Sequence, residues 1–580
     1  MLALLLAARA ALTFGHSMWA WSLNTQRFLD PWLGWGSWTL AALALVPPWA
    51  RRIAPWVARA GDAIDRAPAR SMFLWAVAAG ALAWLTPDRV WFVGDFLMRQ
   101  GLVREGESPA VLFPQALPLD ILLHYHLPRY LTGTALVDAN GAARILGALE
   151  AAAMGALAVA FARGLELPGS ARFASAAVLL FGGYLGLFTG FPKAFAELCL
   201  LVACTAVFGL KVLKQGRGLL PLGLTLAIGV ALHRAALGLL PAVALAFGLW
   251  LAERGRRGAW RRREVLLALA VPLAALAVMV PRIVAVVARW DTVHFTPKTV
   301  QLEGGVLKAA LAGARPADLA NLLVMLSPLS VTIPLLLPGV LSASDRAEAR
   351  TRRREGLLLG TLALPFLAVM PFIHPAQGLF RDWDDFAATG VAVSLLAAWT
   401  VAHAIRLAPH RVWLAVAVVA GAMAPTVQWL AHHRDVERGL QRVRAFMLEP
   451  PRRTDAERGT TWDYLGLRYF ALERWDAAAE AYANAAETAP TSRILQQQAM
   501  AETMRRRYRK AQQLYLKMVV VDPGNVFGWL GLGTTSAHAG DWAEARRAGH
   551  ELLRLQPGNP DALHLLEAVD RLEARSRPSP

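Results

Sequence analysis

Acidic and basic residues that could do chemistry gather in short polar segments between long apolar stretches. The first segment carries Asp95 in the triplet Val93-Gly94-Asp95, a few residues beyond an apolar stretch near 70–86. A carboxylate just outside a membrane helix can act as a general base on the hydroxyl or amide of an acceptor. The position also suits a residue that only caps a helix at the membrane edge, and spacing alone favours that structural role.

Two further motifs follow in the same polar segment. Pro118-Leu119-Asp120 offers a second candidate catalytic carboxylate in Asp120, and His124 and His126 come soon after it. Residues two apart cannot share one helix face, so we expect no metal pair and predict no metal site. A solvated or phosphate-contacting role fits either histidine better, and His124 is the candidate contact to a donor phosphate.

A second charged segment, Arg381-Asp382-Trp383-Asp384-Asp385-Phe386, lies directly before an apolar stretch at 387–405. One interpretation is an interfacial anchor, with the Trp at headgroup level and the carboxylates capping a helix. The other is that Arg381 grips a lipid-linked phosphate while Asp382 and Asp384 orient it. His374 lies upstream and could join either arrangement, so both interpretations stay open.

A third polar position is the pair His233-Arg234, in a short turn between two apolar stretches. Such a pair can snorkel toward water or make a second contact to the donor phosphate. Arg282, near the end of its apolar stretch, poses the same choice.

Two acids, Glu150 and Glu197, lie within apolar stretches. Carboxylates inside a membrane are costly and usually face a cavity or a partner. We expect both to face a cavity, with Glu150 in a supporting, hydrogen-bonding role rather than a catalytic one.

The composition indicates a membrane protein. Hydrophobic residues make up 56% of the 580 residues, and the mean hydropathy is +0.38. The formal charge of +18 sits in short clusters between apolar runs, so we interpret it as a topology signal and expect no nucleic-acid partner. Cys199 and Cys204 share one apolar stretch and do not suggest a disulfide framework.

Thirteen stretches are apolar enough to cross about 30 Å of hydrocarbon. They lie near 2–22, 33–50, 70–86, 143–161, 172–190, 194–210, 218–232, 235–252, 264–288, 319–341, 356–373, 387–405 and 412–430. The first is the weakest, because Arg9 and His16 interrupt it. Together they predict a membrane domain over 1–430.

Lysine and arginine alternate in density along the chain. The segments 51–70, 162–172, 211–217, 253–263, 342–355 and 406–411 hold 23 of these residues in 69 positions, whereas the alternate segments 23–32, 87–142, 190–194, 233–234, 289–318 and 374–386 hold 12 in 116. Cytoplasmic loops carry the excess of positive charge, so the first set is cytoplasmic. The large loop 87–142, the short loop 374–386 and everything after 430 are therefore expected outside.

The C-terminal part is polar and repetitive. After a linker helix within 431–458, the region 459–574 predicts about three tetratricopeptide (TPR) repeats and a capping helix, followed by a frayed tail at 575–580. The first repeat is complete, the second is degenerate and the third is partial. The signature positions are Trp462, Leu465, Gly466, Tyr469, Ala478, Tyr482, Ala485 and Pro490 in the first repeat, and Trp529, Leu532, Gly533, Ala545 and Pro557 in the third.

These motifs resemble the GT-C superfamily of membrane glycosyltransferases, including bacterial members with Gly-Asp, Pro-Leu-Asp…Leu-His and Arg-Asp-Trp-Asp segments. Here these segments are Gly94-Asp95, Asp120 with His124, and Arg381 to Asp384, and the resemblance covers roughly 70–430. It implies an all-α, polytopic bundle of about 11–13 helices, with a TPR α-solenoid attached. It also implies a catalytic Asp in the first large external loop. In the turn at 190–193, where an acid is expected, the chain has Lys193.

The leading hypothesis from this resemblance is a glycosyltransferase that moves a sugar from a polyprenyl-phosphate donor to an extracytoplasmic protein, lipid or envelope glycan. The donor is a substrate, and no cofactor is expected. The alternatives are a non-catalytic TPR scaffold that gathers envelope proteins, and a transporter of lipid-linked intermediates. The repeats predict a protein or peptide partner, and the Ala- and Arg-rich composition indicates a multi-pass protein of a bacterial plasma membrane.

The charge pattern predicts that the TPR region lies outside the cytoplasm. A reporter enzyme that is active only outside should therefore be active when fused after Pro451, and silent when fused within 342–355. Activity at the second position with silence at the first would reverse the topology.

Overall fold

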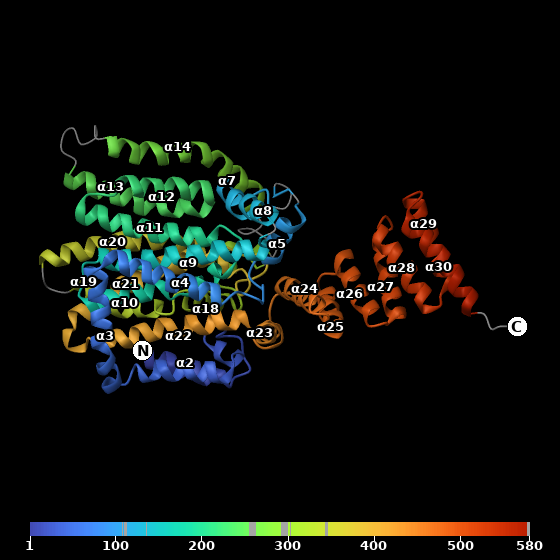
Figure 1. Ribbon diagram of the computed structural model, residues 1–580, viewed down its shortest axis with the longest axis horizontal. Helices are drawn as coiled ribbons and strands as arrows, with labels where there is room; N and C mark the ends of the chain where they lie inside the picture. The colour runs from blue at the N-terminus through green and yellow to red at the C-terminus, as the bar shows by residue number, and fades with distance from the viewer. Residues whose placement is uncertain are drawn as a thin grey trace. The chain divides into compact units, whose positions relative to one another are not determined.

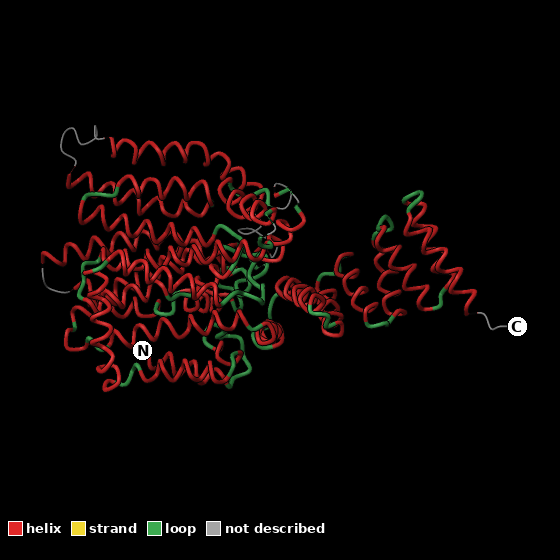
Figure 2. Tube along the Cα trace, in the orientation of Figure 1, coloured by secondary structure: helices red, strands yellow, loops and turns green. Residues whose placement is uncertain are grey.

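The computed structural model describes residues 1–106, 108–109, 113–134, 136–254, 263–291, 300–301, 303–342 and 346–576. All regular elements in these residues are helices (Figure 2), which confirms the predicted all-α fold. The chain divides into two compact units, Met1–Arg442 with Glu449–Pro451, and Val443–Leu448 with Arg452–Pro580. Of the predicted tail at 575–580, residues 577–580 lie outside the described residues.

The first unit is a bundle of long helices joined by shorter ones (Figure 1). Its helices are α1 Leu2–Thr13, α2 Pro31–Leu43, α3 Pro47–Arg66, α4 Pro68–Leu85, α5 Phe96–Glu105, α7 Pro118–Ile121, α8 Leu127–Gly133, α9 Ala139–Gly164, α10 Gly169–Leu180, α11 Phe195–Gln215, α12 Leu219–Leu232, α13 Leu240–Arg254, α14 Arg263–Val286, α17 Val306–Ala309, α18 Arg315–Leu326, α19 Ile333–Ser342, α20 Arg346–Val369, α21 Ala387–Leu407 and α22 Leu414–Arg434. Helix α23 (Val436–Leu448) belongs to this unit as far as Arg442.

Eight helical segments among the described residues are long and apolar enough to cross a membrane, and each coincides with a predicted stretch. The protein is therefore a multi-pass membrane protein. The segments are Pro68–Leu85, Ala139–Gly164, Phe195–Gln215, Arg234–Glu253, Arg263–Trp290, Glu348–Phe372, Trp383–Leu407 and Leu414–Arg434.

Of the other five predicted stretches, those near 2–22 and 218–232 hold apolar helices shorter than a span, Leu2–Thr13 and Leu219–Leu232, and the remaining three are bent or interrupted. The stretch near 172–190 is α10 and the 3₁₀ segment η3 (Gly183–Thr189), which meet at 58°, and the stretch near 319–341 bends by 100° between α18 and the segment Ser330–Ser342. The stretch near 33–50 is interrupted after α2, since α3 begins at Pro47 and Pro cannot continue a preceding helix. Apolar length reveals neither a bend nor an interruption, so the described residues hold eight spans, or ten with the bent pairs.

Helix α21 forms the centre of the bundle. It packs against α10, α11, α19 and α20, and 89% of its apolar window is buried (Figure 1). Its first two turns are mostly small residues, which lets neighbouring backbones approach closely. The charged segment before α21 therefore lies at the end of a helix that is almost wholly buried in the bundle.

Helices α4 and α9 pack closely through glycine. A Cβ atom at Gly155 would lie 2.4 Å from the carbonyl oxygen of Trp75, and one at Gly80 would lie 3.0 Å from that of Ala148. Helices that approach this closely need a residue without a side chain at the contact. This packing fixes α9, which carries Glu150.

The loop after α4 folds into short helices of its own. Pro118 starts α7, which continues through a π-helical turn, η2 (Leu122–His126), into α8. Leu102 and Val103 of α5 pack against Phe113 and Tyr125 in a small apolar cluster. This cluster fixes the two motifs of the loop relative to each other.

The second unit consists of antiparallel helix pairs and a final helix. Its helices are α24 Asp455–Ala471, α25 Trp475–Thr488, α26 Ser492–Met504, α27 Tyr508–Val521, α28 Val526–Ala539, α29 Trp542–Leu555 and α30 Pro560–Ser576. Consecutive helices pack on each other throughout. Three pairs with a terminal helix match the predicted TPR solenoid.

The TPR signature positions lie at the contacts within the pairs. Gly466 of α24 faces the ring of Tyr482 of α25, and a Cβ atom there would lie 2.6 Å from the ring. Trp462, Leu465 and Ala478 are buried beside them. The degenerate second repeat still pairs α26 with α27, because Tyr515 and its apolar neighbours remain buried.

The first unit includes chain beyond the last apolar helix. Arg442 is 1% exposed and donates to the carbonyl oxygen of Trp21 over 2.6 Å. Glu449 pairs with Arg27 at 2.6 Å, and Pro450 accepts a hydrogen bond from the backbone of Met18 at 2.7 Å. Arg442, Glu449 and Pro450 therefore stabilise the N-terminal segment.

These contacts predict where the chain can be shortened. A chain ended after Pro451 should insert and remain monodisperse in detergent, whereas one ended at residue 431 should aggregate, because Arg27 and the Trp21 carbonyl lose their partners. Size-exclusion chromatography of both variants checks this. Equal behaviour of the two would contradict the role assigned to Arg442, Glu449 and Pro450.

Candidate functional site

Gly94 and Asp95 lie in the loop between α4 and α5, beside the start of the central helix. Gly94 has φ +43°, and a Cβ atom there would lie 2.8 Å from Oδ1 of Asp384. Only glycine meets both conditions without strain. Asp95 stands at the N-cap position of α5, yet its carboxylate makes no capping hydrogen bond.

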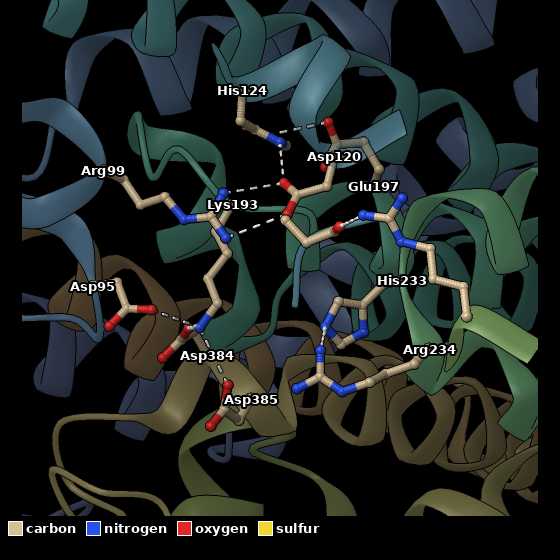
Figure 3. A network of polar contacts seen from close by, with 12 residues as sticks. Asp95, Arg99, Asp120, His124, Lys193, Glu197, His233, Arg234, Asp384 and Asp385 are labelled. Carbon is tan, nitrogen blue, oxygen red and sulfur yellow. Dashed lines mark hydrogen bonds and ion pairs between the residues drawn. The ribbon is translucent and has the colours of Figure 1, made fainter. Parts of the chain in front are cut away.

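The carboxylate of Asp95 instead faces Lys193, in the turn before α11. Lys193 Nζ lies 3.0 Å from Asp384 Oδ2, 3.4 Å from Asp385 Oδ1 and 3.6 Å from Asp95 Oδ2 (Figure 3). Three carboxylates from two distant segments thus surround one ammonium group. We call these four residues the Lys193 centre.

The electrostatics of the Lys193 centre keep Lys193 and Asp95 charged. Burial would lower the pKa of Lys193, but Asp384 and Asp385 raise it above the ordinary value. Burial would raise the pKa of Asp95, but the charges of Lys193 and Arg99 outweigh burial and hold it below the ordinary value. The side chain of Asp95 is 26% exposed and that of Asp384 is 0% exposed, so an incoming group can reach Asp95 but not Asp384.

Arg381 ties the second charged segment to the first. Its Nε donates to the carbonyl oxygen of Phe92 at 3.2 Å, and its own carbonyl accepts from the backbone of Gly94 at 3.1 Å. The guanidinium also lies over the Phe92 ring, 5.5 Å from its centre. The structure therefore brings the two motifs together, although nearly 290 residues separate them.

Gln377 makes a second connection between these segments. Its backbone N–H donates to Asp382 Oδ2 at 2.9 Å, and its side-chain amide lies 3.4 Å from Asp95 Oδ1. Asp382 is buried, and burial raises its pKa well above the ordinary value. Asp382 thus fixes the loop, whereas Gln377 orients Asp95.

Asp120 and His124 belong to a second cluster, which Arg99 connects to the Lys193 centre. Arg99 contacts both carboxylate oxygens of Asp120, at 3.3 and 3.2 Å, and His124 Nδ1 lies 3.0 Å from Asp120 Oδ1. Burial opposes the charge on Asp120, but Arg99 and His124 hold its pKa below the ordinary value. At 2% and 3% exposure, Asp120 and His124 are positioned to support other groups rather than to meet a substrate.

Glu150 and Glu197 complete this second cluster. His124 Nε2 lies 3.4 Å from Glu197 Oε1, and one ligand atom from each of His124, Glu150 and Glu197 falls within 4.8 Å of the others. A histidine and two carboxylates at such spacing could hold a metal ion.

His233 and Arg234 lie at the adjoining end of α12. His233 Nδ1 accepts from the backbone N–H of Ala235 at 3.2 Å, and its ring lies 4.7 Å from that of Phe195. Burial first and Arg234 second lower the pKa of His233 well below its ordinary value, so it is neutral. Figure 3 shows this pair in the same close view as the Lys193 centre.

The remaining candidates make contacts of their own. Arg282 donates to the carbonyl oxygen of Ala116 at 2.9 Å and anchors α14 to the loop. His374 is half-buried, and burial together with Arg315 lowers its pKa to about 4. Neither of these contacts involves a residue of the Lys193 centre.

Sequence analysis does not single out Arg99 or Gln377, and it treats Lys193 only as a departure from a pattern. Arg99 looks like an ordinary loop cation, since its partner Asp120 lies 21 residues away. Lys193 carries a usable signal, because a lysine in a turn that is predicted to face outward runs against the charge pattern.

No protein-family model and no curated protein sequence matches the chain. Among solved structures, it is similar to ArnT from Cupriavidus metallidurans bound to undecaprenyl phosphate, at 15% identity and a TM-score of 0.39, over 62% of this chain and 77% of that one. It is also similar to the second TPR domain of human RPAP3, solved with an HSP70 peptide, at 19% identity and a TM-score of 0.19, over 20% of this chain and 98% of that one. The Sgt2 TPR domain of Aspergillus fumigatus matches at 23% identity and a TM-score of 0.20, over 21% and 84%. Similarities of this strength assign no function.

Removing the ammonium group of Lys193 should strongly lower the stability of the folded protein. Lys193→Met leaves Asp384 buried without its cation, and breaking such a pair costs about 3–5 kcal/mol. Thermal denaturation in detergent should show a clear loss for this variant and little change for Lys211→Met, which alters an exposed lysine of α11. Adding Asp384→Asn to Lys193→Met should restore part of the loss. Unchanged stability of Lys193→Met would show that the ammonium does not hold the centre together.

Proposed function

We propose that the protein is a membrane glycosyltransferase that transfers a sugar from a polyprenyl-phosphate donor to an extracytoplasmic acceptor. The observation that carries the proposal is the partly exposed, ionised carboxylate of Asp95, held between Lys193 and Gln377 beside Arg381. A rigid carboxylate next to a cation provides the two groups that a sugar transfer needs, a base for the acceptor and a positive charge for the leaving group. One group receives the acceptor's proton, and the other meets the negative leaving group.

Asp95 is the proposed general base. Its lowered pKa keeps it ionised throughout the neutral range, because the group protonates only below the ordinary range of an Asp. A carboxylate with a low pKa is a weak base, so the acceptor hydroxyl is expected to lose its proton as the new bond to the sugar forms. Gln377 fixes the direction of the carboxylate, which is the main requirement for such a step.

The donor phosphate requires cations close to this base. Arg381 interacts with the charge of Asp95 and lies in the loop directly before α21, so it is the proposed primary contact. Arg234, with neutral His233 beside it, is the proposed second contact. Planar guanidinium groups suit phosphate oxygens because they can form two parallel hydrogen bonds.

Asp120 and His124 receive a positioning role in this proposal. Both are buried and bonded to each other, and Asp120 also holds Arg99. The donor class is proposed from the sequence motifs. The similarity to ArnT, which was solved with undecaprenyl phosphate, is too low to transfer a ligand.

The TPR unit supports a role in holding a protein or peptide. Val520, Val521 and Phe527 are each about 70% exposed there, and exposed apolar side chains favour association with a partner. The proposed partner is the acceptor or a protein that delivers it. A scaffold protein would use the same TPR surface to bind its partners. It would differ from the enzyme in needing no chemistry at Asp95. A bacterial plasma membrane with the repeats outside is the proposed location.

Substitutions at the proposed base and phosphate contact separate these functions. Asp95→Asn keeps the shape of the side chain and loses the base, so sugar transfer should fall by about 10²–10⁴. Arg381→Lys keeps the charge and loses the planar grip, so the apparent KM for the donor should rise. Glu105→Gln and Arg104→Lys, which alter exposed residues of the same loop, are matched controls.

The measurement is glycan analysis of envelope material from cells with equal expression of each variant, beside cells that lack the whole chain. A glycan profile altered by deletion but unchanged by Asp95→Asn would remove Asp95 as the base. A profile that even deletion leaves unchanged would favour the scaffold function.

A further inference from the structure

Three potential metal ligands converge from separate elements of the membrane unit. His124 belongs to η2, Glu150 to α9 and Glu197 to the first turn of α11. Their ligand atoms lie within 4.8 Å of one another, a separation that one ion can span. Figure 3 shows His124 and Glu197 approaching each other across the second cluster.

The polar atoms of these three residues lack the partners that burial demands. His124 is 3% exposed and Glu150 is 6% exposed. His124 Nε2, Glu150 Oε1 and both carboxylate oxygens of Glu197 are buried and make no hydrogen bond, although His124 Nε2 lies 3.4 Å from Glu197 Oε1 as an ion-pair contact. Buried polar groups are normally satisfied by hydrogen bonds, so this group of atoms favours a bound ion. Two carboxylates supply the negative charge that a divalent cation would neutralise.

The surroundings of His124 match those of a metal-bound imidazole. Asp120 Oδ1 lies 3.0 Å from His124 Nδ1, so Nδ1–H can donate to this carboxylate and the lone pair of Nε2 then faces Glu197. Arg99 holds Asp120 with two contacts and neutralises its charge. A carboxylate that orients a histidine from behind is the usual outer shell of a protein metal site.

We propose that His124, Glu150 and Glu197 bind a divalent transition-metal ion, with Asp120 as the residue that positions His124. One imidazole nitrogen with two carboxylate oxygens suits Mn²⁺ or Zn²⁺ better than Mg²⁺ or Ca²⁺, which prefer oxygen ligands alone. The ion would connect η2, α9 and α11. Arg99, which contacts Asp120, would link this metal site to the Lys193 centre. The site stands independently of the proposed glycosyltransferase activity.

A second buried His–Glu group serves as an internal comparison. His403 Nε2 lies 3.0 Å from Glu355 Oε2, and Lys214 Nζ lies 2.7 Å from Glu355 Oε1. Lys214 lies at the opposite end of α11 from Glu197, about 25 Å away at 1.5 Å per residue. Here an ammonium group already satisfies the carboxylate, so this group offers no metal site.

Metal binding to the purified full-length protein tests the proposal. After chelator treatment and desalting, the protein is titrated with MnCl₂ or ZnCl₂, and bound metal is measured by elemental analysis. Wild-type protein should retain about one ion per chain and unfold at a higher temperature with the ion. Glu150→Gln and Glu197→Gln should abolish retention. Asp120→Asn should weaken affinity by about 10–100-fold. His403→Gln should bind as wild type does.

If the variants do not fold, a measurement on the wild-type protein alone tests the metal site. Pulsed electron paramagnetic resonance of the Mn²⁺-loaded protein should show coupling to one imidazole nitrogen. Failure of the wild-type protein to retain either metal, or Mn²⁺ bound without nitrogen coupling, would overturn the proposal and leave a proton shared by the two glutamates. A negative result here leaves the Asp95→Asn glycan test unaffected, so the two proposals fail separately.

Discussion

The attraction between the Lys193 ammonium and three carboxylates determines how one end of the helices is held together. Asp95 follows α4, Lys193 precedes α11, and Asp384 and Asp385 precede α21, so one cation joins three parts of the bundle. Asp384 is wholly buried and depends on that cation to remain in place. Gly94 allows the approach, because a side chain there would meet the Asp384 carboxylate. The Gly-Asp pair is thus explained by packing as well as by chemistry.

Arg99 links the Lys193 centre to the second cluster, which contains Asp120 and His124. It contributes to the low pKa of Asp95 and grips Asp120, which in turn contacts His124. The two clusters therefore share a cation, and a change in either alters the electrostatic environment of the other. Asp95, whose side chain is 26% exposed, is the part of this framework that solvent can reach.

Much of this organisation can be predicted from the sequence. The features that sequence analysis misses are missed for physical reasons. Apolar length predicts the membrane helices, because it depends on local composition alone, whereas the charge alternation predicts which side the loops face and stays a prediction. The bend between α10 and η3 is missed, since a bent and a straight helix have the same hydropathy. The motifs around Asp95 and Arg381 are visible as clusters of charge. That Lys193 joins them is not visible, because its partners lie about 100 and 190 residues away and depend on how the helices pack.

The burial of α21 has a consequence for how the protein is made. This helix touches protein on nearly every side, and its neighbours α10, α11, α19 and α20 all precede it in the chain. These four helices are therefore synthesised before α21. The acidic residues directly before α21 also come after Lys193 in the chain, so the cation that pairs with them is made before they are.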